Sequence, residues 1–454
     1  MNDSLVGAAS AAGVTTGPLP AARIAAPGPD PADAARSEAG DHDGPPLRVV
    51  IVVETFARDM GYVSSTLPKY LARLGHDVHV VTSQKLPYFQ QGSAERLFGD
   101  DFAERNRNRV GSESLDGYTV HTLPSRDSFG YPRLQGLDAT IAKLRPEVVC
   151  CIVAVGWIAL DCAMAARRQG LPLVIGNHTG KTSFALARSP SPWHDLRRVK
   201  SFLLRELPGR WIATVAHRCV VPTIDCGEVA AGFFGIPRAK IVVMNLPVDS
   251  DHFHVVRNDA DVADREALRA SFGFGSEDIV CVYSGKFSAA KNPLVLQHAI
   301  ALLAKEGYPV RSLFVGAGEQ AEALSADPRS TVVAFRPFHE LGRFYRACDI
   351  GVWTEESISF LDAASSGLPL VLGDTVKDVS HVREFSARFV ANDPASLADA
   401  IRPLLDRTRR REASQKAASL ARERFGALRY VRARLTMFRH AIQNSPSIAR
   451  TKST

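Results

Sequence analysis

The stretch Ile350–Asp374, "IGVWTEESISFLDAASSGLPLVLGD", carries the pattern that decides the fold. One apolar run opens it, a second closes it, and a short helix-like segment ending at Gly367 lies between them. Glycine readily ends a helix because it adopts a left-handed backbone conformation, and Pro369 blocks continuation. The stretch therefore predicts a strand, a helix and a second strand, which is the repeating unit of a parallel sheet covered by helices.

Three carboxylates stand within eight residues of this stretch, at Glu355, Glu356 and Asp362. We expect Ser359 to be the N-cap of the helix, which would place Asp362 at its third position and allow a capping box. A capping box accounts for Asp362 alone, because both glutamates precede the helix. Carboxylates beside free backbone N–H groups suit a sugar phosphate, since they accept hydrogen bonds from sugar hydroxyls while the amides bind phosphate oxygens.

The same alternation of strands and helices fills most of the chain in two successive blocks. Each block begins with an apolar run typical of a strand buried on both faces, "LRVVIVVETF" at Leu47–Phe56 and "DIVCVYSGK" at Asp278–Lys286. Two such blocks predict an α/β protein with two Rossmann-like doubly wound domains that face each other across a cleft. The expected boundaries are a disordered leader at 1–46, an N-terminal domain at 47–253, a linker at 254–276, a C-terminal domain at 277–425, and at 426–454 a tail preceded by a C-terminal helix that could pack back on the N-terminal domain.

The composition indicates an ordinary water-soluble chain with an anionic partner. The 454 residues are 45% hydrophobic and 23% charged, and no run approaches the ~18 apolar residues of a membrane span. The seven cysteines form no C-x-x-C pair, so neither a disulfide framework nor a zinc site is indicated. The N-terminus does not resemble a secretory signal, so we expect a cytoplasmic location. The net charge of +7 favours a phosphate-bearing ligand, a membrane surface or nucleic acid.

Part of the positive charge lies in "DLRRVKSFLLRELPGR", residues Asp195–Arg210. A solvated helix face explains it at least as well as any function. The alternative is a peripheral contact with an anionic inner-membrane face. Nucleic acid is not expected, because aromatic residues do not alternate with the basic ones. The membrane contact would involve Arg197, Arg198, Lys200 and Arg205.

Lysines and glycines follow the strands of the second block. In "SGKFSAAKNP", Lys286 follows Gly285, and Lys291 stands five residues later. Two ammonium groups on one loop repel each other unless an anion lies between them, and a diphosphate meets that need; two solvent-exposed lysines are the simpler alternative. "VGAGEQ" places Gly316 and Gly318 after the next strand, where small residues permit a tight turn.

These segments together resemble the retaining glycosyltransferases of family 4, or group 1, which have the GT-B fold. The resemblance runs roughly from Leu47 to Arg439. It is carried by "SGKFSAAKNP", by "LFVGAGE", by "RFYRACDIGVWTEESISFLDAASSGLPLVLGD", and in the first block by "GYVSSTLPKYLARLGHDVHVVTS" and the strand-end His178. The third segment is similar to the family's Tyr…Asp strand, its Glu-x7-Glu pair and its Ala-x-x-x-Gly-x-Pro sequence.

The resemblance implies transfer of a sugar from a nucleoside-diphosphate sugar to an acceptor hydroxyl. The nucleotide sugar would be a co-substrate, with no catalytic metal or other cofactor, and the acceptor a glycan or lipid-linked molecule in cell-surface polysaccharide or glycolipid synthesis. Lys286 and Lys291 would bind the diphosphate, Asp362 the ribose, and Glu356, or with less support Glu355, the donor sugar. His178 would lie near the transferred sugar. The other implied substrate contacts are Gly61, Gly285, Gly316, Gly318, Ser357, Ile358 and Ser359.

The sequence also departs from the family pattern. Thr354 stands where the first glutamate of the Glu-x7-Glu pair is expected, and Asp362 replaces the second. Lys286 stands where arginine is common, which removes a two-pronged grip on phosphate. These changes keep two alternatives open: a nucleotide-sugar epimerase of the same architecture, with Glu54 as a strand-end carboxylate, and a non-catalytic nucleotide-sugar-binding partner.

Overall fold

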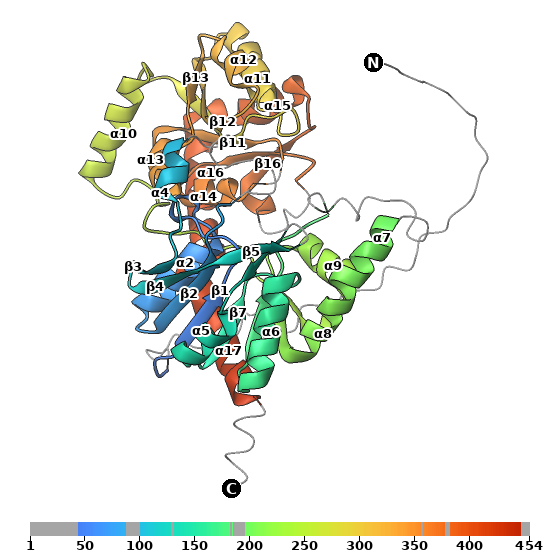
Figure 1. Ribbon diagram of the computed structural model, residues 1–454. Helices are drawn as coiled ribbons and strands as arrows, with labels where there is room; N and C mark the ends of the chain where they lie inside the picture. The colour runs from blue at the N-terminus through green and yellow to red at the C-terminus, as the bar shows by residue number, and fades with distance from the viewer. Residues whose placement is uncertain are drawn as a thin grey trace, which may run out of the picture. The chain divides into compact units, whose positions relative to one another are not determined.

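The computed structural model describes residues 44–87, 100–128, 131–181, 184, 196–355, 357–376 and 382–445. All of them belong to one compact unit, Asp41–Thr454. The predicted disordered leader therefore lies outside the described residues, apart from Gly44–Pro46. Figure 1 shows the described chain coloured from the N-terminus to the C-terminus.

The first block forms an eight-stranded sheet with the strand order β10-β9-β8-β7-β1-β2-β4-β3. Its neighbours are parallel except for β3, which is antiparallel to β4. Because β1 lies between β2 and β7, the winding of the sheet reverses there, and ligands of such sheets bind beyond the carboxyl ends of the strands. The strands are β1 (Arg48–Val52), β2 (Asp77–Ser83), β3 (Gly111–Leu115), β4 (Tyr118–Leu123), β7 (Val148–Cys151), β8 (Leu173–Gly176), β9 (Ala216–Val221) and β10 (Ile241–Val243).

Helices cover this sheet, and a small hairpin lies beside it (Figure 1). The first α-helix described is α2 (Val63–Arg73), which buries Leu67, Tyr70 and Leu71 against the strands because its apolar residues recur on one face. The other elements are η1 (Arg58–Met60), α4 (Asp100–Arg105), β5 (Ser125–Ser128), β6 (Tyr131–Leu134), α5 (Leu137–Leu144), α6 (Trp157–Gln169), α7 (Leu196–Ser201), η4 (Phe202–Glu206), α8 (Leu207–Val215), α9 (Ile224–Phe233) and η5 (Arg238–Lys240).

The second block forms a six-stranded parallel sheet with the order β13-β12-β11-β14-β15-β16. Here the winding reverses at β11, so the loops that follow β11 and β14 are neighbours. The strands are β11 (Ile279–Lys286), β12 (Val310–Ala317), β13 (Ser330–Val333), β14 (Ile350–Trp353), β15 (Leu370–Gly373) and β16 (Ser386–Phe389); the helices are α11 (Leu294–Lys305), α12 (Ala321–Ser325), α13 (Phe338–Ala347), α14 (Ser359–Ser365), η6 (Arg383–Phe385), α15 (Pro394–Ile401), η7 (Arg402–Leu405) and α16 (Arg407–Phe425).

The polar segment read as a linker contains a helix, α10 (Asp259–Ser271). Asn258 caps it by accepting a hydrogen bond from the Asp261 amide at 3.0 Å. Its polar appearance in the sequence has a physical reason, because α10 is held on the second domain by charged groups. Arg269 Nη1 lies 3.1 Å from Asp349 Oδ2, and its Nη2 donates to the Asp278 carbonyl at 2.7 Å.

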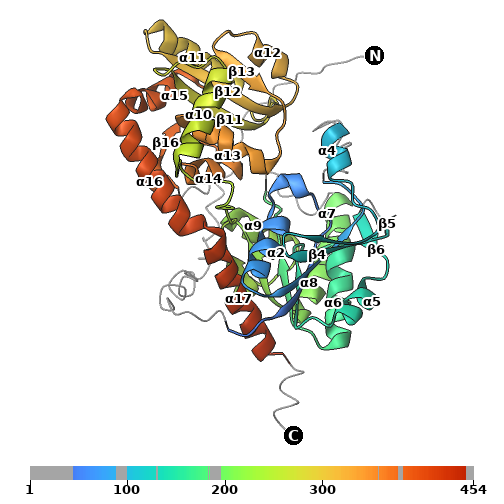
Figure 2. The same ribbon diagram turned by 90° about the vertical axis from the view of Figure 1, so that its left-hand side faces the viewer.

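The chain passes between the two domains at two points that touch each other. Val248 and Gly426 form a parallel β-bridge, with Val248 N donating to the Phe425 carbonyl at 2.8 Å. Before this point, α16 packs on the core of the second domain; after it, α17 (Ala427–Gln443) packs into the core of the first. Both ribbon views show α17 returning beside the N-terminal sheet (Figures 1 and 2).

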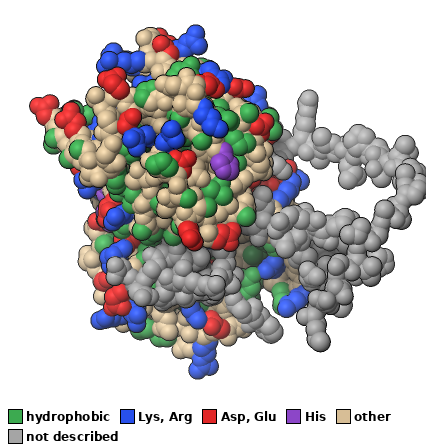
Figure 3. All heavy atoms as spheres, turned by 90° about the horizontal axis from the view of Figure 1, so that it is seen from above, with side chains coloured by type: hydrophobic (Ala, Val, Ile, Leu, Met, Phe, Trp, Pro, Cys, Tyr) green, Lys and Arg blue, Asp and Glu red, His purple; other side chains and the backbone are tan. Residues whose placement is uncertain are grey.

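None of the helices in the described ranges is long and apolar enough to cross a bilayer. Seen from above, basic and acidic side chains are interspersed over the visible face (Figure 3). The positive net charge is therefore not gathered into one patch on that face.

Candidate functional site

The loop after β11 carries Lys286 and Lys291, and both lysines are half-buried. The carbonyl of Lys286 accepts a hydrogen bond from the Tyr283 hydroxyl at 3.1 Å. Farther along the loop, the amide of Ala289 donates to Glu319 Oε1 at 2.9 Å. The loop is therefore held at its start and near its middle. Burial lowers the pKa of Lys286, so the site withdraws this ammonium group from water.

The glycines of "VGAGEQ" have a packing role. Gly316 and Gly318 have φ values of +154° and +153°, which other residues rarely adopt. A Cβ at Gly316 would collide with the carbonyl of Gly285, and one at Gly318 with the backbone of Phe287. These glycines are thus required by the close approach of the ends of β11 and β12, whatever ligand binds there.

The loop after β14 lies directly against the lysine loop. The Thr354 hydroxyl donates to the carbonyl of Lys291, and the Trp353 indole N–H donates to the carbonyl of Ser284 at 3.0 Å. The indole N–H also lies 3.1 Å from Ser359 Oγ, which contacts Ser357 Oγ at 2.7 Å. The structure therefore brings together the lysine loop and the start of α14, which the sequence separates by about 70 residues.

The predicted capping box is wrong. Helix α14 begins at Ser359, its N-cap is Ile358, and no side chain caps it. The physical reason is the buried Trp353 indole. Its N–H needs an acceptor and donates to the Ser359 hydroxyl, which is therefore engaged away from the helix start. Ser357 takes over part of the capping role, because its hydroxyl lies 3.4 Å from the Ser359 amide. The prediction that Gly367 ends the helix is confirmed, since Gly367 has a φ of +93° just after the C-cap.

Asp362 lies one turn into α14 and is half-buried. Burial, and secondarily the charge of Asp249, hold the pKa of its carboxyl well above the usual range. Asp249 in turn accepts hydrogen bonds from Lys69 Nζ at 2.6 Å and from the Tyr70 hydroxyl at 2.8 Å. Sequence reasoning missed this cluster, because Lys69 and Asp249 are 180 residues apart and neither belongs to a local motif.

Of the two glutamates in the stretch Ile350–Asp374, the structure describes Glu355 but not Glu356. Glu356 lies outside the described residues, so its proposed sugar contact stays a prediction. Glu355 is half-buried, and its charge adds to burial in raising the pKa of Tyr283. Since the Tyr283 hydroxyl contacts the Lys286 carbonyl, Glu355 lies near the lysine loop.

Gly61 contacts the second domain. It ends η1 with a φ of +59°, and a Cβ there would collide with the ring of Phe338 at the start of α13. In this structure the space beside Gly61 is therefore filled by an aromatic ring.

A cavity of about 290 Å³ adjoins this contact and is lined by Arg58, Asp59, Ser65, Thr66, Lys69, Leu115, Asp116, Tyr118, Asp249, His252, Phe338 and His339.

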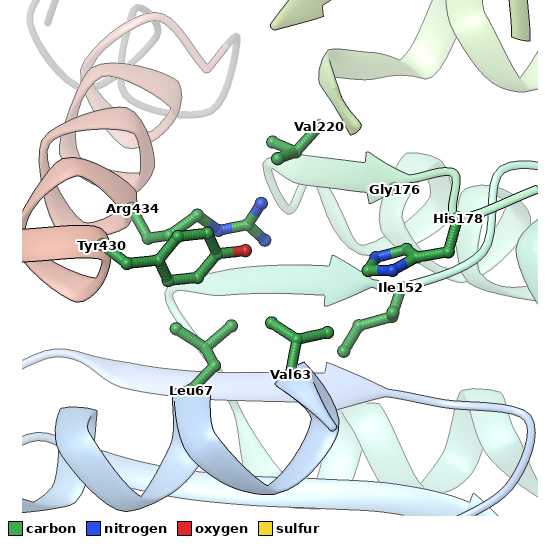
Figure 4. A pocket seen from close by; sticks show the side chains of 8 residues that line it. All are labelled: Val63, Leu67, Ile152, Gly176, His178, Val220, Tyr430 and Arg434. Carbon is green, nitrogen blue, oxygen red and sulfur yellow. The ribbon is translucent and has the colours of Figure 1, made fainter. Parts of the chain in front are cut away.

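His178 follows β8 at the carboxyl end of the N-terminal sheet. The residue as a whole is exposed, but its ring lines a small cavity together with Tyr430 and Arg434 of α17 (Figure 4). Burial and the nearby Arg434 guanidinium lower the pKa of the imidazole to about 4. The hydrogen bonds of the described residues do not join His178 to the cluster on the C-terminal sheet.

The basic side chains of the segment Asp195–Arg210 are not all exposed where the structure describes them. Arg205 is half-buried, donates to the Tyr131 hydroxyl at 2.5 Å and lies 5.0 Å above the ring of Phe184. Lys200 is exposed, whereas the side chains of Arg197 and Arg198 lie outside the described residues. Large apolar side chains in the same segment are 40% to 53% exposed: Val199, Phe202, Leu203, Leu204 and Leu207.

Family profiles match both halves of the chain. The profile described as "Glycosyltransferase Family 4" matches residues 61–252, and "Glycosyl transferases group 1" matches residues 278–407. Together the two profiles cover most of the chain, which therefore belongs to the family 4, group 1 glycosyltransferases and has two domains of the GT-B fold. Within the described ranges, no group of three or more His, Cys, Asp or Glu side chains is arranged to hold a metal ion.

Curated relatives are named D-inositol 3-phosphate glycosyltransferase. The protein from Streptomyces avermitilis is 26% identical over 60% of this chain and 60% of its own length. The protein from Catenulispora acidiphila is 25% identical over 73% of this chain and 83% of its own length. The chain thus spans about 60% of the length of the Streptomyces relative.

Solved structures share the fold. HepE of Anabaena in complex with UDP has a TM-score of 0.61 and 15% identity, covering 87% of this chain and all of that one. Sucrose-phosphate synthase of Thermosynechococcus elongatus has a TM-score of 0.62 and 15% identity, covering 88% of this chain and all of that one.

Proposed function

We propose that this protein transfers a sugar, with retention of anomeric configuration, from a nucleoside-diphosphate sugar to an acceptor hydroxyl. One observation carries the proposal: the contact between the Thr354 hydroxyl and the Lys291 carbonyl, which holds the lysine loop against the loop before α14. An anion in this position would meet ammonium groups and backbone N–H groups together, which is the arrangement that a diphosphate requires.

In this mechanism the bond between the anomeric carbon and the phosphate oxygen breaks, and negative charge grows on the diphosphate. Lys286 and Lys291 stabilise that charge, since preorganised cations act most strongly where charge develops in the transition state. Helix α14 has only seven residues, so it contributes individual N–H groups more than a helix dipole. The acceptor hydroxyl attacks from the same face, and its proton passes to the leaving phosphate oxygen.

His178 is proposed to contact the transferred sugar from the N-terminal side. Its lowered pKa keeps the imidazole uncharged at neutral pH, so it can exchange hydrogen bonds with sugar hydroxyls without repelling the lysines. Asp362 is proposed to hold the ribose, and its raised pKa favours a protonated carboxyl that donates as well as accepts.

The acceptor is proposed to be a polyol, either lipid-linked or phosphorylated. The name shared by the curated relatives favours a phosphorylated polyol. The apolar surface of α7, η4 and α8 favours a membrane-bound acceptor, because five large exposed apolar side chains close to Lys200 suit an anionic lipid surface. Sedimentation with anionic and neutral vesicles tests the second: the double variant Phe202→Ser, Leu203→Ser should lose binding to the anionic vesicles.

A thermal-shift screen with UDP, GDP and ADP tests the donor site. The matching nucleotide should raise the melting temperature through mass action, because it binds the native state alone. The matched nucleotide sugar then distinguishes the alternatives: a glycosylated acceptor supports the transferase, an epimerised sugar the epimerase, and binding without turnover the non-catalytic partner. If none of the three nucleotides shifts the melting temperature, the proposal is wrong.

A further inference from the structure

Arg434 is a buried cation without a carboxylate partner among the described residues. It lies on α17 with 3% of its surface exposed, and its Nη2 donates to Cys150 Sγ at 2.8 Å. Among the described residues, its Nε has no hydrogen-bond partner. The rings of Tyr430 and Phe438 lie 5.9 Å and 5.3 Å from the guanidinium. A thiol and two rings offset little of the cost of removing a guanidinium from water, so stability alone gives no reason for an arginine here.

The guanidinium and the imidazole of His178 line the same cavity. Its volume is about 10 Å³, which is room for one water molecule. Figure 4 shows the two side chains entering this space from opposite sides, Arg434 from α17 and His178 from the end of β8. The other lining residues are glycine or apolar apart from Tyr430, so a water there would find its partners in Arg434, His178 and the Tyr430 hydroxyl.

We infer that Arg434 is a positioning residue for His178, acting through one water molecule in this cavity. An arginine has donors and no acceptor, so the water accepts from Arg434 and keeps both hydrogens to donate, one of them to the imidazole. The ring nitrogen that faces the cavity is then the acceptor, and the other nitrogen carries the proton. His178 would thus present an N–H donor to the cleft. This inference rests on the proposed function, which places the transferred sugar there.

The electrostatics of the cavity agree with this geometry. From α17, the groups that face His178 are Arg434 and Tyr430; α2 contributes Val63 and Leu67, and the ends of β7 and β9 contribute Ile152 and Val220. The thiols Cys150 and Cys219, on the same strands, have raised pKa values and are therefore uncharged. Arg434 is the one charge in this set, and a protonated imidazole opposite it would repel it.

The test compares Arg434→Met, Arg434→Lys and the control Arg432→Met, which removes an exposed arginine from the same helix. The readouts are the ¹⁵N-NMR titration of the His178 imidazole and the pH profile of kcat/KM. Arg434→Met should raise the imidazole pKa by about one unit, a tenfold change in proton affinity, and move the acid limb of the profile up by the same amount. Arg434→Lys should retain most of the wild-type behaviour, and Arg432→Met all of it.

The melting temperature of the Arg434 variants distinguishes a residue that positions His178 from one that only stabilises the fold. Because a methionine fills the site without a buried charge, Arg434→Met should melt at the wild-type temperature or higher. A lower melting temperature with an unshifted titration would show a merely structural arginine and overturn the inference. If Arg434→Met does not fold, the wild-type titration decides, because an imidazole that titrates near 6.5 contradicts the inference. The NMR readout needs no turnover, so absence of transfer would count against the proposed function alone.

Discussion

The two domains build their parts of the site in different ways. In the C-terminal domain, the lysine loop and the start of α14 follow adjacent strands of one sheet, and hydrogen bonds within that domain hold them together. In the N-terminal domain, His178 faces side chains of α17, a helix from the far end of the chain. The comparison teaches that a sequence motif locates the C-terminal part of the candidate site, whereas the N-terminal part depends on which helix the topology brings to the sheet.

The largest effect is expected from the ion pair that joins α2 to the segment before the second domain. Lys69→Met leaves Asp249 buried without its cation, and breaking a buried pair in this way typically costs about 3–5 kcal/mol. Denaturant unfolding measures the loss. The matched control is Arg168→Met, whose pair with Asp138 is exposed and should contribute no more than about 1 kcal/mol. Equal losses in the two variants would contradict a special role for this pair.

The lysine loop should give the next largest effect, on the affinity for the donor. Lys291→Ala removes a charged hydrogen bond to the proposed diphosphate, which is worth about 1.5–3 kcal/mol or roughly 10- to 150-fold in Kd. Isothermal titration with the matching nucleoside diphosphate measures it. Lys305→Ala, exposed at the end of α11, is the control and should leave Kd unchanged. An unchanged Kd in Lys291→Ala would refute the diphosphate assignment.

A smaller effect is expected at Thr354, which stands where the family has a glutamate. Thr354→Val keeps the side-chain shape but leaves the Lys291 carbonyl without this donor, at a cost of about 1–3 kcal/mol. Because the lysine loop would then be held less firmly, Kd for the nucleotide should rise together with the loss of stability. Thr354→Ser keeps the hydroxyl and should restore both. A loss of stability without any change in Kd would show that the contact does not serve the donor site.

The smallest effect is the pH dependence contributed by Asp362. Its folded pKa is raised, so the unfolded chain releases this proton first, and the native state loses stability as the pH rises from the ordinary aspartate range toward the raised value. Asp362→Asn should therefore gain in melting temperature over the wild type at pH 7 relative to pH 4. Asp259→Asn, at an exposed position in α10, should show no such change between the two pH values. The opposite sign would mean that Asp362 is charged in the native state.

The sequence predicted what short-range patterns determine. The strand–helix–strand unit around Gly367 and the two sheets of mainly parallel strands follow from the sequence pattern and glycine positions, and both are confirmed. Helix α10 was missed because it is stabilised by charged contacts with Asp349 more than by an apolar face.

The rest depends on contacts between distant parts of the chain. The capping box failed because the indole of Trp353 competes for the Ser359 hydroxyl, a tertiary effect that a local pattern does not contain. Arg434 and Cys150 are 284 residues apart, and nothing near either residue in the sequence marks the pair. The roles of Glu356 and the other substrate contacts stay predictions.

The bridge between Val248 and Gly426 bears on how such enzymes can be recombined. Since α17 follows the second domain in the sequence but completes the core of the first, the N-terminal half is not one continuous segment of the chain. A chimera cut once, at Val248, would combine a foreign terminal helix with the native N-terminal sheet and exchange Arg434 along with it. A hybrid that keeps an intact N-terminal core therefore needs two junctions, one at each strand of this bridge, so that residues 427–445 stay with the N-terminal sheet they pack on.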